Sequence, residues 1–158
     1  VGAFADCMAG LGARPGLLDT LRSQALEARK PFLGICVGMQ LLADRGEEDG
    51  QHQGLGWIPG CVTRLSPASP ALKVPHMGWN TLHFHQPHPL LAGLKPQTHA
   101  YFVHSYAFRL SQPGHCIAST DHGGMVPAVV SLGNLAGVQF HPEKSQQTGL
   151  AFLRNFLD

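Results

Sequence analysis

The sequence has 158 residues, of which 13% are charged and 44% hydrophobic, and 11 Lys and Arg against 10 Asp and Glu leave a formal charge of +1. This length suits one domain with its own core, and a near-neutral charge without a basic stripe disfavours a nucleic-acid-binding protein. Every apolar run is shorter than the ~18 residues of a membrane span, and four cysteines without a C-x-x-C pair favour a reducing, cytoplasmic setting.

Hydrophobic spacing predicts helices at both ends of the chain and strands between them. Glycine (19) and proline (12) are frequent and separate the predicted elements. The expected helices cover 4–12, about 16–28, 39–43 and 147–157, with a loop over 46–56. The expected strands cover 31–35, 61–65, 79–84, 100–108, 116–120, 128–132 and 135–140. This order predicts an α/β protein with an open mixed sheet, flanked by helices and extended by antiparallel strands.

The sharpest local pattern is Gly34-Ile35-Cys36-Val37-Gly38, between an expected strand and an expected helix. It is the G-x-nucleophile-x-G elbow with cysteine as the nucleophile. The two glycines would relieve crowding in the turn, and the helix N-terminus would favour the thiolate of Cys36. The amide of Val37 would point at an oxyanion. From this pentapeptide alone, a buried structural cysteine is an equal alternative.

A cysteine nucleophile needs a base, and the base needs an orienting group. The best pair is His141 and Glu143, which follow the apolar run 135–140 and are separated by the rigid Pro142. Glu143 could accept the Nδ1 proton of His141 and leave Nε2 facing the sulfur. Alone, His-Pro-Glu is more often a surface turn. Together with the elbow, it predicts a Cys-His-Glu triad.

Five sequence blocks follow one another in a fixed order: VGAF (1–4), GICVGMQLL (34–42), PHMGWN (75–80), YFVHSY (101–106) and HPEKS (141–145). This set resembles the class I, triad-type glutamine amidotransferases, with their flavodoxin-like open sheet. The elbow and His-Pro-Glu are shared by many amidotransferases. PHMGWN and YFVHSY narrow the resemblance to the glutaminase subunits of imidazole glycerol phosphate synthase.

The resemblance implies a glutaminase that converts L-glutamine to glutamate and ammonia through a glutamyl thioester, without a cofactor. Cys36 would attack the side-chain amide, His141 would pass the proton to ammonia, and Glu143 would orient His141. The residues implied for the substrate are Gly2, Gln40, Ser105 and Tyr106, and those for the oxyanion hole are Val37 and Val1.

The same resemblance implies a heterodimer with a (β/α)8 synthase subunit of histidine biosynthesis, which would receive the ammonia. The products there would be imidazole glycerol phosphate and an aminoimidazole carboxamide ribotide. Glutaminase activity would stay low until the ligand-occupied synthase docks. The implied docking residues are Met77, Trp79, Asn80, Tyr101 and Lys144.

The resemblance also predicts that residues 1–158 form one amidotransferase domain that is incomplete at its N-terminus and lacks the first strands of the sheet. We expect this polypeptide alone to be poorly stable and a weak glutaminase, because the edge of its sheet would be exposed. Comparing its soluble yield and glutamate release with those of a longer form tests this expectation.

Three alternatives remain open at this point. Another class I amidotransferase, of the anthranilate or GMP synthase type, would share the triad but not PHMGWN. A non-catalytic module on the same fold would have no need of a thiol in the elbow. A metal protein could use His83, His85 and His88, but no nearby Cys or carboxylate joins them, so no metal is predicted.

Overall fold

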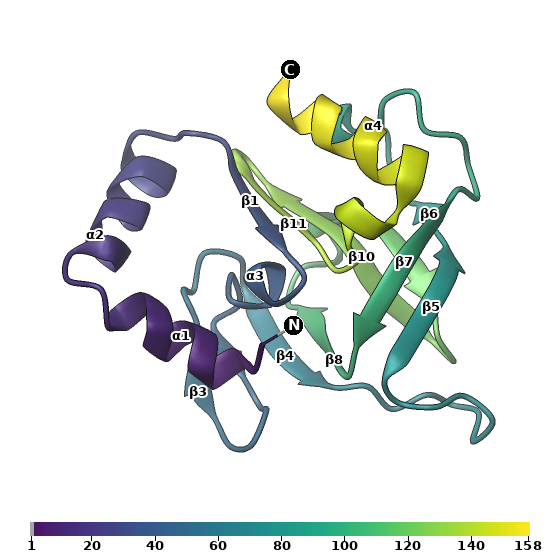
Figure 1. Ribbon diagram of the computed structural model, residues 1–158, viewed down its shortest axis with the longest axis horizontal. Coiled ribbons are helices and arrows are strands. Elements are labelled where there is room, and N and C mark those ends of the chain that lie inside the picture. The colour runs from purple at the N-terminus through teal and green to yellow at the C-terminus, as the bar shows by residue number, and fades with distance from the viewer. Residues whose placement is uncertain (1) are drawn as a thin grey trace.

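A five-stranded mixed sheet forms the centre of the fold in the computed structural model, which describes residues 2–158 (Figure 1). Its strand order is β1-β11-β10-β9-β6, in which β1 and β11 are parallel and the other neighbours are antiparallel. The strands are β1 (Phe32–Ile35), β6 (His83–Phe84), β9 (Cys116–Asp121), β10 (Met125–Leu132) and β11 (Leu135–Val138). The predicted open mixed sheet is therefore confirmed.

Two smaller sheets complete the β-structure of residues 2–158. One has the order β3-β2-β4-β8, and the other is a two-stranded antiparallel ribbon of β5 and β7. Their strands are β2 (Arg45–Gly46), β3 (His52–Gln53), β4 (Gly60–Arg64), β5 (His76–Thr81), β7 (His99–His104) and β8 (Tyr106–Leu110).

The helices lie at the two ends of the sequence and beside β1. In Figure 1, α4 lies across the sheet near β7 and β10, whereas α1 and α2 lie beyond β1. Within the described residues, no helix combines the length and the apolar character needed to cross a membrane. The α-helices are α1 (Phe4–Gly12), α2 (Leu17–Arg22), α3 (Val37–Gln40) and α4 (Gln146–Leu157); α2 continues as a π-helical segment η1 (Ser23–Glu27), and single 3₁₀ turns are η2 (Pro89–Leu91), η3 (Pro113–His115) and η4 (Pro142–Lys144).

Two apolar cores lie on the two faces of the five-stranded sheet. Ala136 and Val138 of β11 belong to one core, whereas Leu135 belongs to the other, as the alternation of side chains along a strand requires. In the first core, which includes α4, aromatic rings contact edge to face: Phe102 with Phe140 at 6.1 Å and Phe140 with Phe152 at 5.6 Å between centroids. The second core includes Phe4, Met39, Leu42, Ile58, Val62 and Phe108.

The predicted strand 100–108 is wrong in one respect, because the chain changes sheets in the middle of it. β7 ends at His104 and pairs with β5, and β8 begins at Tyr106 and pairs with β4. Ser105 lies between them, and its carbonyl accepts a hydrogen bond from the amide of Leu65 at 2.8 Å. The apolar pattern runs through this break, since apolar residues are buried on both sides of it, so the pattern alone does not reveal it.

Three further expectations need correction. The strand expected over 79–84 is divided between two sheets, because β5 ends at Thr81 and pairs with β7, whereas β6 begins at His83 and pairs with β9. The helix expected over 39–43 begins earlier and is a single turn, Val37–Gln40, after which the chain turns toward β2. The loop expected over 46–56 contributes residues to two short strands, β2 and β3.

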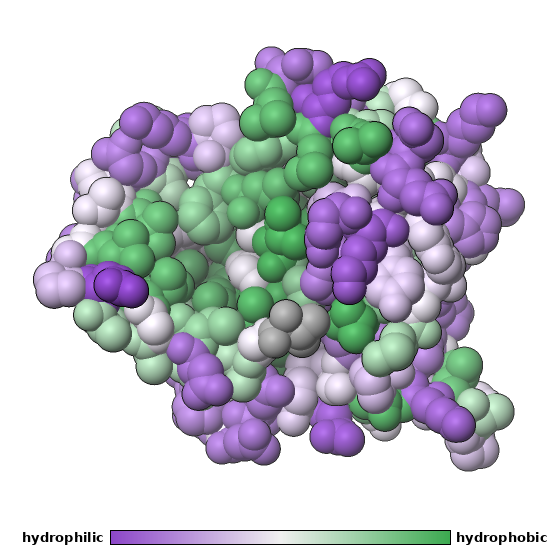
Figure 2. Space-filling model, viewed as in Figure 1, coloured by the Kyte–Doolittle hydropathy of each residue, from purple (hydrophilic) through white to green (hydrophobic). Residues whose placement is uncertain are grey.

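Apolar side chains are exposed beside β1, which is an edge strand of the five-stranded sheet. Figure 2 shows a hollowed apolar area between β1 and the helices α1 and α2. Ile35 and Leu26 are among the large hydrophobic residues exposed in this part of the chain. These apolar side chains lie beside the free edge of the five-stranded sheet.

Candidate active site

The parallel register of β1 and β11 brings the two ends of the triad to one edge of the sheet. Ile35 lies opposite Val138, and the amide of Cys36 continues this ladder by donating to the Val138 carbonyl at 2.7 Å. Because parallel strands present their carboxyl ends at the same edge, Cys36 and the residues after Val138 leave the sheet together. His141 is the third residue after Val138.

Cys36 has the strained backbone of a nucleophile elbow, with φ 52° and ψ −113°. A non-glycine residue adopts such a conformation only where its surroundings impose it. A side chain at Gly34 would overlap the backbone carbonyl of Gly38, so the first glycine is sterically required. A Cβ at Gly38 would meet nothing within 4 Å. The expectation that both glycines relieve crowding is therefore right for Gly34 and wrong for Gly38.

The thiol of Cys36 is buried, with 5% of the residue exposed. Burial raises the pKa of the Cys36 thiol, and this effect outweighs a hydrogen bond from the Val37 amide, which lowers the pKa. The predicted preference for a thiolate is wrong for this state of the protein, because α3 has one turn only and the sulfur is desolvated. Cys36 therefore needs a neighbouring base to become a nucleophile.

That base is available in His141, whose Nδ1 lies 2.7 Å from Oε1 of Glu143. His141 is buried, and its Nε2 finds no hydrogen-bond partner within residues 2–158. Partial burial alone would raise the pKa of the Glu143 carboxyl, but hydrogen bonds from its own amide and from His141, with the charge of Lys144, lower it. An ionised Glu143 holds the proton on Nδ1 and leaves the Nε2 lone pair open.

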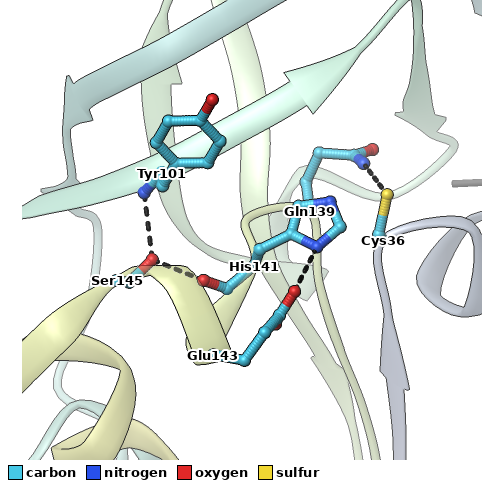
Figure 3. Close-up of polar contacts among 6 residues, drawn as sticks. All are labelled: Cys36, Tyr101, Gln139, His141, Glu143 and Ser145. Carbon is cyan, nitrogen blue, oxygen red and sulfur yellow. Dashed lines mark hydrogen bonds and ion pairs between the residues drawn. The ribbon is translucent and has the colours of Figure 1, made fainter.

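Ser145 fixes the turn that carries His141. Its hydroxyl donates to the His141 carbonyl at 2.7 Å and accepts from the Tyr101 amide at 2.9 Å (Figure 3). The His141 amide also donates to the Tyr101 carbonyl at 2.9 Å. The turn is therefore bound to β7 as well as to β11. In Figure 3, the imidazole lies between Glu143 and the side chains of Gln139 and Cys36.

A cavity of about 200 Å³ opens beside Cys36 and gathers the predicted substrate residues. Its lining includes Gly2, Cys36, Val37, Gln40, His104, Ser105, Tyr106 and Glu48. A wider groove of about 720 Å³ lies near Phe84 and Leu91, but no cysteine or carboxylate lines it. We place the site at the smaller cavity, because the nucleophile is there. Val1, the second predicted oxyanion donor, lies outside the described residues.

Two residues of the site were missed by sequence reasoning. Glu48 stands in a loop that offers no pattern, yet it lines the cavity, and its carboxylate accepts a hydrogen bond from the Phe4 amide at 2.8 Å. Gln139, inside the GVQF run, is fully buried, and its Nε2 lies 3.8 Å from the Cys36 sulfur. An amide in an otherwise apolar strand was the available signal for Gln139.

Four of the five predicted docking residues gather on one surface. The rings of Trp79 and Tyr101 are 5.9 Å apart across the β5–β7 ribbon, and Nζ of Lys144 lies 5.6 Å from the Tyr101 ring. Met77, on the same face of β5 as Trp79, is 63% exposed.

Asn80 does not join this surface, because it lies on the opposite face of β5. Its Nδ2 donates to the Asp121 carbonyl at 2.7 Å and lies 3.1 Å from Nε2 of His76. Asn80 is thus a structural bridge from the ribbon to β9, in contrast to the docking role that the resemblance implied.

A pair of buried histidines joins the ribbon to the cavity. Nδ1 of His76 lies 3.0 Å from Nε2 of His104, and Nδ1 of His104 donates to the Tyr106 carbonyl at 2.8 Å. Burial, with a smaller contribution from the neighbouring histidines, lowers the pKa of His76 to about 3 and that of His104 to about 4. Both rings are neutral near pH 7, so the donors and acceptors of this chain are fixed.

The fold agrees with the comparisons. The sequence profile described as glutamine amidotransferase class-I matches residues 10–158, so the chain belongs to the class I glutamine amidotransferase family. A crystal structure of a glutamine amidotransferase superposes with a TM-score of 0.63 at 22% identity, covering 90% of this chain and 69% of that one. A glutamine amidotransferase from Thermotoga maritima superposes with a TM-score of 0.58 at 19% identity, covering 91% of this chain and 55% of that one. These two likenesses concern the fold.

More similar relatives define the particular family. The chain is 57% identical over 158 residues to the imidazole glycerol phosphate synthase subunit HisH of Rhodospirillum rubrum, covering 99% of this chain and 74% of that protein. It is 58% identical over 159 residues to the imidazole glycerol phosphate synthase subunit HisH of Zymomonas mobilis, covering 100% of this chain and 73% of that protein. Within the class, the chain belongs to the HisH subunits of imidazole glycerol phosphate synthase. The predicted kind of enzyme, an amidotransferase subunit of that synthase, is confirmed.

Proposed function

We propose that this chain hydrolyses L-glutamine through a Cys36-His141-Glu143 triad and delivers the ammonia to a synthase partner in histidine biosynthesis. The observation that carries the proposal is a strained, buried Cys36 at the end of β1, beside the strand that leads to a histidine held by Glu143 at 2.7 Å. Nε2 of His141 is buried and finds no partner in residues 2–158, so its lone pair is free, and the proton transfer requires it to close on the Cys36 thiol when glutamine binds.

In the first step, Nε2 of His141 takes the thiol proton of Cys36, and the sulfur attacks the side-chain carbonyl carbon of glutamine. The amide of Val37 stabilises the oxyanion, with the amide of Val1 as a second donor. When the intermediate collapses, the C–N bond breaks and His141 returns the proton to the departing nitrogen, which leaves as ammonia. Water then gives a proton to His141 and attacks the thioester, so glutamate and the free thiol form.

The amino-acid end of glutamine is bound by polar groups around the cavity. The carboxylate of Glu48 pairs with the α-ammonium group, and Oε1 of Gln40 is an acceptor for the same group. Both hydrogens of the Gln40 amide are already used by the Tyr106 carbonyl and Gln139, each at 3.0 Å. Backbone groups of Gly2, Ser105 and Tyr106 bind the carboxylate end. Replacing Glu48 by Gln is expected to raise KM for glutamine with a smaller change in kcat.

The partner is a (β/α)8 synthase subunit that binds the surface formed by Met77, Trp79, Tyr101 and Lys144. Exposed aromatic and methionine side chains are typical of interface centres. The synthase uses the ammonia to make imidazole glycerol phosphate and an aminoimidazole carboxamide ribotide. All four cysteines are free thiols, which supports a cytoplasmic setting.

A glutamine-analogue electrophile tests the proposal directly. The probe is expected to modify Cys36 alone, as mapped by peptide mass spectrometry, and the Cys36→Ala variant is expected to lose both labelling and glutamate release by at least about a thousandfold. Cys116→Ala is the matched control, because Cys116 is equally buried at 5% exposure but lies on β9. Glutamate release by Cys36→Ala at the wild-type rate, with the synthase present, would contradict the triad.

A further inference from the structure

We propose that Gln139 is a positioning residue that holds the Cys36 sulfur and stabilises its thiolate through a side-chain N–H bond. The proposal rests on the glutaminase function and adds a residue to its machinery. Gln139 follows Val138 at the end of β11, beside Cys36 at the end of β1, so the parallel register places the two side by side. Its side chain is fully buried, and its Nε2 lies 3.8 Å from the sulfur.

The neighbouring bonds determine which end of the Gln139 amide faces the sulfur. The carbonyl of Tyr106 can only accept, so the Gln40 group 3.0 Å from it is Nε2, the donor. The same Nε2 lies 3.0 Å from Gln139, whose contacting atom must therefore be Oε1, the acceptor. Nε2 of Gln139 is then the atom directed at Cys36. This chain of bonds runs from the substrate-binding backbone at Tyr106 to the nucleophile.

A donor in this position has a specific effect on the reaction. The bond from an N–H group to sulfur strengthens as the sulfur becomes negative. Because the sulfur is otherwise desolvated, few groups are available to support its charge when His141 takes the proton. Gln139 therefore favours the thiolate, and its bond to Gln40 holds it in place.

The pH dependence of Cys36 alkylation tests this role without glutamine turnover. Iodoacetamide reacts with the thiolate, so the rate at Cys36, followed by peptide mass spectrometry, reports its apparent pKa. In Gln139→Met, which keeps the length but loses the donor, the profile should shift upward, slowing alkylation about tenfold below the pKa, the equivalent of one pKa unit. The exposed Gln112→Met is the matched control and should follow the wild type.

Gln139→Glu tests whether the group at position 139 reaches the sulfur. It keeps an acceptor for Gln40 but replaces the donor near sulfur by a carboxylate oxygen, whose charge opposes the thiolate, so alkylation should be slower than in Gln139→Met. A wild-type profile for Gln139→Glu would overturn the proposal, because it would show that this side chain does not act on the sulfur. Superimposable profiles for Gln139→Met and the wild type would overturn it as well.

Cys116 provides an internal control for folding, because it is buried and its sulfur donates to the Ala118 carbonyl at 3.3 Å. If Gln139→Met makes Cys116 reactive, Gln139→Asn replaces it in the test. The shorter amide withdraws the donor from the sulfur, so a slowed profile supports the proposal and an unchanged one refutes it. A chain without glutaminase activity can still show these shifts, so the two proposals fail separately.

Discussion

The strand pair β1–β11 and the ribbon β5–β7 differ in how much of their surface is buried. β11 contributes buried residues to both cores, β1 lies parallel beside it, and their shared end carries Cys36 and the turn to His141. The ribbon is two strands wide, and one face exposes Met77 and Trp79. The proposed catalytic residues thus lie where the backbone is held by the sheet and its cores. The proposed docking surface lies on the ribbon, where large apolar side chains are exposed to water.

The largest change in stability is expected when a methyl group is added at Gly34 in the elbow. Gly34→Ala forces a Cβ against the Gly38 backbone, which cannot move without breaking the turn, so we expect a loss of about 4 kcal/mol in unfolding free energy. Gly38→Ala meets open space and should change stability by less than about 1 kcal/mol. Urea unfolding measures both. Equal losses in the two variants would show that the elbow is not sterically constrained.

A pH effect is expected next, from the histidines that join the ribbon to the cavity. Burial lowers the folded pKa of His76 to about 3 and of His104 to about 4, against about 6.5 in the unfolded chain. As pH falls below about 6.5, the two histidines bind protons in the unfolded state but remain neutral in the folded state. Stability is therefore lost from about pH 6.5 down to about pH 3 to 4, by on the order of 2 kcal/mol for each histidine at pH 5.

Thermal unfolding midpoints at pH 7.5 and pH 5 check this prediction in the wild type and in His76→Gln. The variant removes one of the two groups, so its midpoint should depend less steeply on pH. An identical dependence in both proteins would mean that His76 does not contribute, whatever the other titrating groups do.

The smallest effect on stability is expected at the exposed tryptophan of the ribbon. Trp79 is 49% exposed, so Trp79→Ala should cost less than about 1 kcal/mol in the isolated chain. It should nevertheless weaken binding to the synthase subunit by about thirtyfold or more, as loss of a central aromatic residue does. Calorimetric titration with the synthase and urea unfolding measure the two quantities.

The other tryptophan is the matched control for that variant. Trp57 is 9% exposed and contacts Phe32 edge to face at 5.0 Å, so Trp57→Ala should lose about 3 kcal/mol of stability. If the two alanine variants unfold at the same urea concentration, the contrast between a buried sheet and an open ribbon is wrong.

Most of the fold could be predicted from the sequence, because apolar spacing identifies a helix or strand wherever one element packs on one core. The helix over 4–12 and the strands at 61–65, 116–120 and 135–140 are confirmed within a few residues. The break at Ser105 was not predictable in this way, since both sides of it are equally apolar. Pairing between distant segments decides where the chain changes sheets.

In the candidate site, too, sequence patterns do not reveal contacts between distant segments. Cys36, His141 and Glu143 carry short motifs whose chemistry can be inferred from spacing alone. The structure pairs His141 with Glu143 and places both after β11, the strand that is parallel to the one leading into Cys36. Glu48 and Gln139 could not be inferred, because each acquires its place through a partner far away in the chain: the Phe4 amide for one and Gln40 for the other. Motifs reveal chemistry within a segment, whereas contacts between segments complete the cavity.

The attachment of Ser145 to Tyr101 has a mechanical consequence for the whole molecule. It couples the imidazole of His141 to strand β7, whereas the thiol of Cys36 is anchored to β1 on a different sheet. Because the same turn also follows β11, on the sheet that carries Cys36, a rotation of the two-stranded arm strains the turn that positions the imidazole. Movement of the ribbon is in this way transmitted through the Ser145 hydroxyl to the group that takes the proton.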